Sequence, residues 1–458
     1  MSLHLTDSLT GKSVAFPKTK KPIRLFVCGP TVYDYSHIGH ARTYIAFDAF
    51  ARFLRWRAQP VTYIQNITDV DDKIIARAAE RSVSYTAIAR YYERAYHAAE
   101  KKLNIVSVDS YPRASSYIKE IIALIEALIA KGYAYQTDHG VYFEVKKFPR
   151  YGELSRQNLD AVRPGWRVEI DPQKKDPLDF ALWKKTKGEK PAWQSPWGAG
   201  RPGWHIEDTA ITQKLFGVQY DIHGGASELK FPHHESEIAQ QEAVSGKHPM
   251  VKAWMHTGVL LINGQKMSKS LKNFVTIDEF LSTYTANTLR YLVLSHHYRS
   301  PIDYSPEAAH AAHEAAQSIE RFAAYSAFVA GAQKTGKRLK IAQWQKTVMA
   351  ALENDFNTPA ALAELFRVIS YINENALSLH HTDILTARSW VLQILAMLGF
   401  TPPTMQKIPT SLARWARKRE VCRASKQFMQ ADALRKKIQE VGYTVDDTPI
   451  GPFLYHQR

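Results

Sequence analysis

The sequence predicts an α/β protein with a parallel sheet, followed by a helical bundle and a small basic C-terminal domain. Over the first 133 of 458 residues, short apolar runs alternate with longer stretches whose apolar side chains recur every three or four positions. This alternation of strand and helix patterns is typical of a parallel sheet covered by helices. After about residue 305 the composition changes to alanine-rich helical patterns, such as 308–332 and 360–376, which indicates a bundle.

The first expected elements bring two loops to one edge of the sheet. Residues 23–31 form an apolar run that ends in a Gly-Pro turn, as a buried strand would. Residues 40–56 have the broad apolar face of an amphipathic helix, and residues 60–65 form a second apolar run. Ligands of parallel α/β sheets bind beyond the carboxyl ends of the strands, so residues 28–40 and 66–73 are expected on the same rim.

Composition divides the rest of the chain into further segments. Tyr, Trp, Pro, Gly and Lys are frequent between residues 134 and 204, which predicts an insertion of short strands and loops, and the α/β pattern returns at 216–223. The expected boundaries are 1–133 and 205–260 for the two halves of the sheet domain, 134–204 for the insertion, 261–305 for a loop region, 306–400 for the bundle and 401–458 for the C-terminal domain.

The charge balance limits the class of partner. The chain has 60 Lys and Arg against 44 Asp and Glu, a formal net charge of +16, and residues 401–458 contribute +6 of it from 11 basic and 5 acidic side chains. This excess favours a polyanionic partner, with nucleic acid as the leading candidate, although positive charge also serves solubility alone. Only two cysteines are present, which excludes a disulfide framework and favours a reducing compartment.

No apolar stretch is long enough to predict a membrane span. The most apolar helical candidate, Ile121–Ala130, is about ten residues long and contains Glu126, whereas a bilayer requires roughly twenty. Residues 1–21 mix polar and basic side chains and contain no run like a secretory signal. Neither a membrane span nor a secretory signal is therefore expected.

Two histidines mark the expected start of the first helix. His37 and His40 are one helical turn apart in the segment 29–40, where the strand gives way to the helix. A helix start offers free N–H groups and the positive end of the helix dipole, which suits phosphate. Gly39 would allow a flat base to approach the backbone closely. Taken alone, the same histidines are more typical of ordinary polar residues at a helix start.

A second basic motif lies far downstream. Lys266-Met267-Ser268-Lys269-Ser270 follows an Asn-Gly turn. Two lysines and two hydroxyls on such a loop can fold over a triphosphate and neutralise the charge that moves onto pyrophosphate. The alternative for this motif by itself is a solvated loop with ordinary lysines.

Together, in this order on an α/β chain, the two motifs resemble the signatures of class I aminoacyl-tRNA synthetases. Further segments resemble the cysteinyl-tRNA synthetase family over essentially the whole chain: 26–34, 66–75, 176–184, 195–198, 200–207, 231–240, 355–359, 431–435 and 447–449. The resemblance implies a Rossmann-like catalytic domain with a connective insertion, a DALR-type bundle and an anticodon-binding C-terminal domain. It also implies a monomeric cytoplasmic enzyme that joins L-cysteine to tRNA(Cys) with ATP and Mg²⁺.

The resemblance also assigns residues of the reaction site. The catalytic residues it implies are His37, His40, Lys266 and Lys269. The ATP-binding residues it implies are Gly29, Pro30, Thr31, His37, Gly39, His40, Lys266, Met267, Ser268, Lys269 and Ser270. Thr68, Trp204 and Glu228 would line the amino-acid pocket.

The metal site that the family implies is altered in this sequence. Members hold zinc with two Cys, one His and one Glu, and Cys28, His233 and Glu237 fall on three of these positions. The fourth position is Asp208 instead of Cys. A carboxylate ligates zinc at nearly the same distance as imidazole and carries the same charge as thiolate, so this set is chemically reasonable, although fewer sulfur ligands make it less selective for zinc. The alternatives are that no metal binds or that the substrate is not cysteine.

A metal ion in this pocket would explain how the enzyme discriminates cysteine from serine. A merely apolar pocket rejects an isosteric competitor only about a hundredfold. Metal–thiolate bonding discriminates better, because the serine hydroxyl stays protonated at neutral pH.

The basic C-terminal segment is the expected tRNA-binding region. The candidate side chains are Arg414, Trp415, Arg417, Lys418 and Arg419. Basic groups would contact phosphates, and an aromatic ring would contact unstacked bases. The alternative is a solvated basic helix face. The family usually has a Trp near its end, and residues 451–454 depart from that pattern.

Two other functions stay open at this point. One is a related ligase that uses a different amino acid or passes it to a small amine, but such relatives lack the C-terminal region that this chain keeps. The other is a non-catalytic tRNA-binding protein, which the intact His37, His40, Lys266 and Lys269 disfavour.

Overall fold

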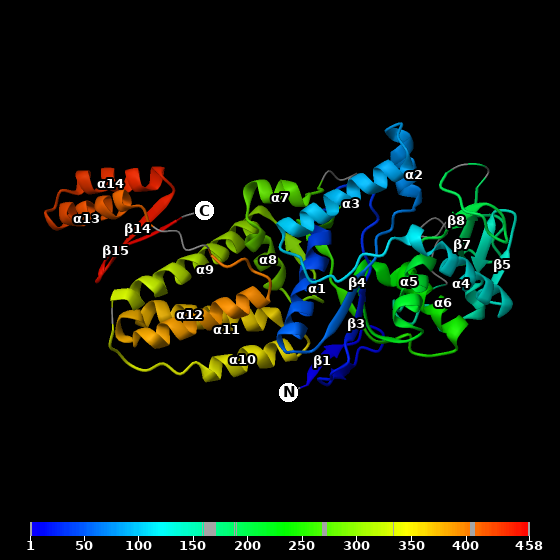
Figure 1. The fold of residues 1–458 in the computed structure, drawn as a ribbon, viewed down its shortest axis with the longest axis horizontal. Helices are drawn as coiled ribbons and strands as arrows, with labels where there is room; N and C mark the ends of the chain where they lie inside the picture. Colours follow the sequence, from blue (N-terminus) through cyan, green and yellow to red (C-terminus); the bar gives the residue numbers. More distant parts are fainter. Residues whose placement is uncertain are drawn as a thin grey trace. The chain divides into compact units, whose positions relative to one another are not determined.

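The computed structural model divides the chain into two compact units. The first contains Met1–Thr283, His296–Tyr304 and Glu353–Phe356, and the second contains Tyr284–Ser295, Ser305–Leu352 and Asn357–Arg458. The structure describes residues 2–157, 159, 171–186, 188, 190–267, 273–332, 334–403 and 408–456 (Figure 1).

A four-stranded parallel sheet forms the centre of the first unit. Its order is β10-β9-β3-β4, with β3 at Ile23–Val27, β4 at Val61–Gln65, β9 at Tyr220–Ala226 and β10 at Val251–Thr257. Each neighbouring pair is parallel; for example, Leu25 pairs with Tyr63 on one side and Ile222 on the other. The predicted parallel sheet is therefore confirmed, and its apolar strands are buried because helices cover it.

Helices of the first unit follow the strands in the order that the sequence indicates. They are α1 (Ile38–Trp56), α2 (Asp72–Glu80), α3 (Tyr85–Lys102), α4 (Ile118–Ala130), α5 (Ile206–Phe216), α6 (Glu235–Ser245) and α7 (Ile277–Thr283). Helix α1 begins two residues before the predicted 40–56, because the His37 ring caps it. The pattern at 216–223 divides between the end of α5 and the start of β9, with Gly217 at φ 85° ending the helix.

Short antiparallel strands lie among the described residues of the predicted insertion. They are β5 (Ala134–Gln136), β6 (Gly140–Phe143), β7 (Phe180–Lys185) and β8 (Gly200–Pro202), paired in this order. Other strands of the first unit are β1 (Leu3–Thr6), β2 (Ser13–Phe16), β11 (Leu260–Ile262), β12 (Gln265–Lys266) and β13 (Ile302–Tyr304). The sequence analysis did not predict the β1–β2 hairpin, although Leu3 and Leu5 alternate with polar residues as in a half-buried strand.

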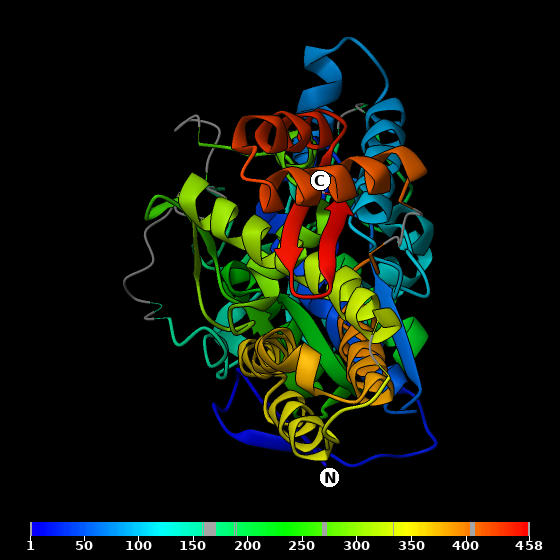
Figure 2. The ribbon, with the colours of Figure 1, turned by 90° about the vertical axis from the view of Figure 1, so that its left-hand side faces the viewer.

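The second unit is helical and ends in a hairpin. Its helices are α8 (Ala286–Leu294), α9 (Pro306–Ala332), α10 (Ala342–Glu353), α11 (Thr358–Asn375), α12 (His381–Met397), α13 (Thr410–Ala424) and α14 (Phe428–Glu440). Strands β14 (Tyr443–Thr448) and β15 (Gly451–His456) pack on α13 and α14 (Figure 2). Leu412, Ile438 and Val445 are in their small core. No helix among the described residues is long and apolar enough to cross a membrane.

Candidate active site

A cavity of about 290 Å³ opens at the carboxyl ends of the parallel strands. Cys28 follows β3, Asn66 follows β4, Glu228 follows β9 and Gly258 follows β10, and all four line the cavity. Of the residues predicted for ATP, amino acid and metal, the structure brings together around it Cys28, Gly29, Pro30, Thr31, His37, Gly39, His40, Thr68, Trp204, Asp208, Glu228, His233, Lys266 and Met267.

The turn after β3 is held against the end of β4. A Cβ on Gly29 would lie 1.7 Å from the Asn66 carbonyl oxygen, so only glycine fits at this position. The Gly29 N–H donates to the Asn66 side-chain oxygen at 2.6 Å, and Thr31 and Thr68 form a β-bridge. This contact aligns the two loops that the sequence places on one rim.

His37 and His40 are neutral hydrogen-bond donors at the start of α1. The His37 Nδ1 accepts the N–H groups of Gly39 and His40 at 3.1 and 3.3 Å, which leaves its proton on Nε2. The two rings stack with centroids 3.8 Å apart. Burial lowers the pKa of His37 to about 4. Burial also lowers the pKa of His40 well below its usual value, helped by the repulsion that a second protonated ring beside His37 would meet and by the charge of Lys73. At neutral pH both side chains therefore offer donors without charge.

The predicted metal ligands meet at the other end of the cavity. The His233 Nε2 is 3.1 Å from Asp208 Oδ2 and 3.2 Å from Glu237 Oε1, and Cys28 Sγ is 3.9 Å from the same Glu237 oxygen. All four side chains are buried, and one ligand atom from each lies within 4.8 Å of every other. We call Cys28, Asp208, His233 and Glu237 the cavity-facing set, because the first three line the cavity.

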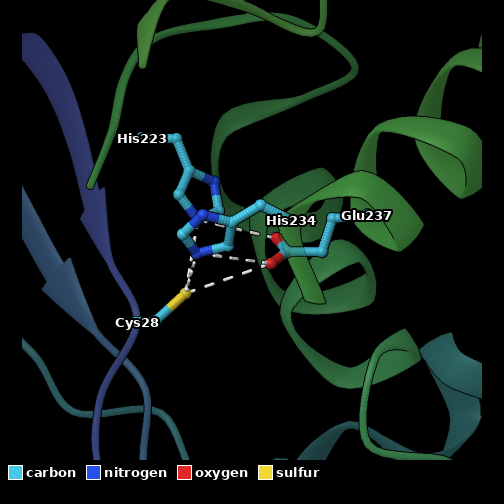
Figure 3. Close-up of side chains that lie close together, drawn as sticks. All are labelled: Cys28, His223, His234 and Glu237. Atoms are coloured by element: carbon cyan, nitrogen blue, oxygen red, sulfur yellow. Dashed lines mark hydrogen bonds and ion pairs between the residues drawn. The ribbon is translucent and has the colours of Figure 1, made fainter. Parts of the chain in front are cut away.

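A second set of four possible ligands lies behind the cavity and shares two of these residues. It consists of Cys28, His223, His234 and Glu237, and Figure 3 shows both imidazoles and the carboxylate gathered at the Cys28 sulfur. The Sγ atom is 3.1 Å from His234 Nε2 and 3.4 Å from His223 Nε2. We call this the deep set. The sequence analysis did not single out His223 and His234, although the segment His223-Gly224-Gly225, which lies within β9, and the pair His233-His234 were signals.

Hydrogen bonds to the opposite ring nitrogens orient these histidines. The Nδ1 of His223 is 2.6 Å from the Tyr220 hydroxyl, and the Nδ1 of His234 is 2.8 Å from His256 Nε2. The Nδ1 of His233 is 2.9 Å from His205 Nδ1. Such outer partners fix ring orientation in metal sites.

The cluster concentrates buried acidic groups. Burial, reinforced by the nearby Asp208 charge, raises the pKa of Cys28, Glu237 and Glu207 well above their usual ranges. The Oε2 atom of Glu237 is buried and has no hydrogen-bond partner among the described residues. A divalent cation would stabilise the ionised forms of these groups, so the residues present fit a metal ion.

The amino-acid end of the cavity has further polar contacts. Asp208 Oδ1 accepts a hydrogen bond of 2.5 Å from the Asn66 amide, and the Thr68 hydroxyl donates to Glu207. The Trp204 ring stacks on the His233 ring with centroids 4.5 Å apart. Asn66 and Glu207, which the sequence analysis did not assign, therefore position two residues that it did.

The lysine motif is described only in part. Lys266 forms an ion pair with Glu228, and Met267 lines the cavity. The predicted residues Ser268, Lys269 and Ser270 lie outside the described residues.

The five predicted tRNA-binding residues of the second unit differ in exposure. Arg414, Arg417 and Lys418 are exposed on α13, and Trp415 is half-buried under Lys437, whose Nζ lies 4.3 Å from the ring centroid. Arg419 is 1% exposed and pairs with Asp447 through Nη1 and Nη2 at 2.5 and 3.1 Å. Arg419 therefore links α13 to β14 through this ion pair.

The fold places the chain in a known class of enzymes. A profile described as tRNA synthetases class I (C) catalytic domain matches residues 15–314, and a DALR domain profile matches residues 347–400. The solved structure of Mycobacterium tuberculosis methionyl-tRNA synthetase in complex with methionyl-adenylate has a TM-score of 0.59 and 17% identity, covering 82% of this chain and 89% of that one. The Agrobacterium radiobacter K84 LeuRS-tRNA-LeuAMS complex has a TM-score of 0.65 and 10% identity, with 84% of each chain covered. The fold is that of a class I aminoacyl-tRNA synthetase.

Two relatives specify the family within this class. The cysteine–tRNA ligase of Thermoplasma volcanium is 42% identical over 428 residues, with 93% of each chain covered. That of Dichelobacter nodosus is 40% identical over 467 residues, with 100% of each chain covered. The chain belongs to the cysteine–tRNA ligase family, which confirms the resemblance seen in the sequence motifs.

Arg419 is buried and Arg417 is exposed, so we expect their substitution to change the free energy of unfolding by different amounts. We expect Arg419→Ala to lower the free energy of unfolding of the C-terminal region by about 2 kcal/mol, because it leaves Asp447 without its buried partner while that carboxylate stays partly solvated. Arg417→Ala, the exposed control, should change it by less than about 0.5 kcal/mol. Urea denaturation measures both, and equal effects would contradict the structural role of Arg419.

Proposed function

We propose that this protein activates L-cysteine with ATP and transfers it to the 3′ end of tRNA(Cys). The observation that carries the proposal is a single cavity with phosphate-binding features at one end and thiol-binding features at the other. His37 and His40 line the first end, and Cys28, Asp208 and His233 line the second. Membership of the cysteine–tRNA ligase family supports the same reaction.

In the first step the cysteine carboxylate attacks the α-phosphate of ATP and pyrophosphate leaves. The Nε2–H groups of His37 and His40 would donate to the phosphates, and Lys266 and Lys269 would take the charge that develops on pyrophosphate together with Mg²⁺. Gly29, Pro30, Thr31 and Gly39 would leave room for the nucleotide. No protein nucleophile is needed, because the catalysis consists of positioning and electrostatic stabilisation.

We propose that the cavity-facing set holds a zinc ion. Cys28, Asp208 and His233 line the cavity whereas His223 and His234 do not, so only this set offers the ion to a substrate. When bound, the ion supplies a ligand position for the cysteine thiolate, which serine cannot match. Thr68, Trp204 and Glu228 would hold the rest of the amino acid, and His223 and His234 would fix the Cys28 sulfur through their hydrogen bonds.

In the second step a ribose hydroxyl of the tRNA terminus attacks the adenylate carbonyl. The exposed Arg414, Arg417 and Lys418, with the half-buried Trp415, are the best-placed groups on α13 to contact the tRNA, and Arg419 would support the helix instead. We infer that the enzyme acts as a monomer in the cytoplasm, in line with the family resemblance and with two cysteines that are both free.

Amino-acid-dependent ATP–pyrophosphate exchange tests the function. We expect cysteine to support exchange and serine to support it at least about a hundredfold less well, because a metal-bound thiolate exceeds the discrimination of an apolar pocket. Exchange driven by another amino acid would overturn the cysteine assignment. No exchange with any amino acid would favour a non-catalytic tRNA-binding protein, and exchange without transfer to tRNA would favour a ligase with a small-amine acceptor.

Two variants of His37 separate its capping role from its role toward phosphate. Asn at position 37 can still accept the backbone N–H groups but has no donor at the position of Nε2, so His37→Asn should slow exchange by about 10²–10³-fold. His37→Gln keeps a donor near that position and should lose less activity. Rates of exchange at saturating ATP and cysteine provide the comparison, and a fully active Asn variant would remove His37 from phosphate binding.

The metal proposal predicts that zinc binding depends on the ligands of the cavity-facing set but not on His223, which belongs to the deep set alone. Asp208→Asn and His233→Ala should weaken zinc binding at least about tenfold, because each removes a ligand of the cavity-facing set. His223→Asn removes a ligand of the deep set only and should retain most of the zinc. Elemental analysis after dialysis against a chelator measures this difference. Zinc loss confined to the His223 variant would assign the ion to the deep set, and zinc-free wild-type protein with full activity would refute both.

A further inference from the structure

The short segment Glu353–Phe356, between α10 and α11, belongs to the first unit, although most of α10 and all of α11 belong to the second. It contains the start of the motif 355–359, whose residues do not line the active cavity. Asp355 and Phe356 have φ values of 56° and 47°, in the left-handed region that residues other than glycine rarely adopt. Backbone of this kind persists only where surrounding contacts hold it, and it is concentrated at functional positions.

Contacts with α1 hold the main chain on either side of Asp355. The Phe356 ring is fully buried and packs on Phe50 and Phe53, with ring centroids 5.3 and 5.6 Å away. The Glu353 carboxylate pairs with Arg57, the residue that ends α1, at 3.0 Å. The segment is therefore fixed to the helix whose first turn carries the two histidines of the phosphate end.

The Asp355 carboxylate connects two further segments of the first unit. Its side chain is 13% exposed. Oδ1 accepts hydrogen bonds from the Tyr298 hydroxyl at 2.7 Å and from the Thr6 N–H at 2.8 Å. Oδ2 accepts from the Thr6 hydroxyl at 2.8 Å and from Arg299 Nε at 2.9 Å, and Arg299 Nη2 donates to it as well. Charge-assisted contacts of this number fix the turn 297–300, which we call the supporting turn.

The supporting turn holds one wall of the active cavity. The wall consists of residues 258–260, all of which line the cavity. The Tyr298 carbonyl accepts the N–H of Gly258 at 2.8 Å, and the Val259 carbonyl accepts the N–H of Ile302 at 2.9 Å, just after the turn. Strand β11 then pairs with β13 in parallel. The position of the wall therefore depends on the position of the turn.

The same wall leads to the lysine motif and is tied to α1. Strand β11 continues into the β11–β12 hairpin, which carries Lys266. Arg42, two residues after His40 on α1, is 1% exposed and donates through Nη2 to the carbonyls of Tyr298 and Ser300. The supporting turn thus contacts both parts of the ATP end, namely the start of α1 and the base of the lysine hairpin.

We propose that Asp355 is a positioning residue for ATP. Through Tyr298 and Arg299 it holds the supporting turn, and the turn holds the wall and the Lys266 hairpin in register with the start of α1. The inference rests on the proposed function and adds a residue to its first step. The metal and cysteine contacts are placed by β3, α5 and α6 instead, so a displaced wall should weaken ATP binding and spare cysteine.

Asp355→Asn tests this role through the two Michaelis constants of cysteine-dependent ATP–pyrophosphate exchange. The amide loses one acceptor and the charge that faces Arg299, so the KM for ATP should rise about fivefold or more, while the KM for cysteine stays within about twofold. A smaller folded fraction would lower kcat and change neither KM, so the split reports positioning. An unchanged KM for ATP, or an equal rise of both constants, would overturn the proposal.

Tyr298→Phe provides a milder break in the same path. It removes the hydroxyl that Asp355 accepts but keeps the ring and the carbonyl that binds Gly258. The KM for ATP should rise less than in Asp355→Asn. The double variant should show less than the product of the two single effects, because both substitutions break one link. A full product would overturn the path through Tyr298 that the proposal requires.

Asp383 in the second unit supplies a matched control. Its side chain is 10% exposed and accepts hydrogen bonds from Arg338 Nε and Nη2 at 2.8 and 3.0 Å and from the Leu339 N–H at 2.8 Å. Asp383→Asn breaks a comparable network and should leave both KM values within about twofold. An equal rise of the KM for ATP in the Asp383 and Asp355 variants would show a general effect and overturn the proposal.

Calorimetric titration with Mg²⁺-ATP, without cysteine, separates this inference from the proposed function. Wild-type enzyme should bind ATP about fivefold more tightly than Asp355→Asn. Equal affinities would overturn the positioning role. If the wild type shows no cysteine-dependent exchange but still binds ATP more tightly than the variant, the cysteine function fails and the positioning role of Asp355 is supported.

Discussion

The site depends on one close backbone contact, between Gly29 and Asn66. The absence of a Cβ at position 29 allows the turn after β3 to cross the end of β4, where any side chain would lie 1.7 Å from a carbonyl oxygen. Cys28 precedes the contact, and Thr31 follows it with its bridge to Thr68. The same short stretch leads into the His37 cap of α1. The proposed metal ligand Cys28, the proposed amino-acid contact Thr68 and the proposed phosphate donor His37 therefore all depend on one glycine for their positions.

Buried charge sets the second constraint on the cavity. Cys28, Glu207 and Glu237 share a region with Asp208, and burial lowers the pKa of His223 and His234, so these two imidazoles stay neutral. No fixed cation among these imidazoles offsets the acidic groups. A carboxylate at position 208 keeps the charge that a thiolate would bring, so the attraction for a divalent ion is preserved although one sulfur ligand is replaced.

Local sequence patterns predicted the parallel sheet and the long helices. Family motifs predicted the four residues of the cavity-facing set as metal ligands. What they missed depends on contacts between distant segments. His223 and His234 reach Cys28 only because β9 pairs with β3 and α6 begins beside that edge, which no local period encodes. Arg419 looks like its basic neighbours in sequence, and its burial follows from pairing with Asp447 on β14. Helix α1 begins two residues earlier than predicted, because an imidazole acts as its cap, a role usual for Ser, Thr, Asp or Asn.

Trp204 supports one face of His233, a proposed metal ligand. The two rings stack with centroids 4.5 Å apart. The His233 Nε2 atom lies 3.1 Å from Asp208 and 3.2 Å from Glu237, and its Nδ1 atom lies 2.9 Å from His205. The imidazole is therefore oriented through both ring nitrogens and one face before any ion binds, as outer partners do in metal sites. Because Trp204 also lines the cavity, the same indole that orients this proposed ligand would contact the bound amino acid.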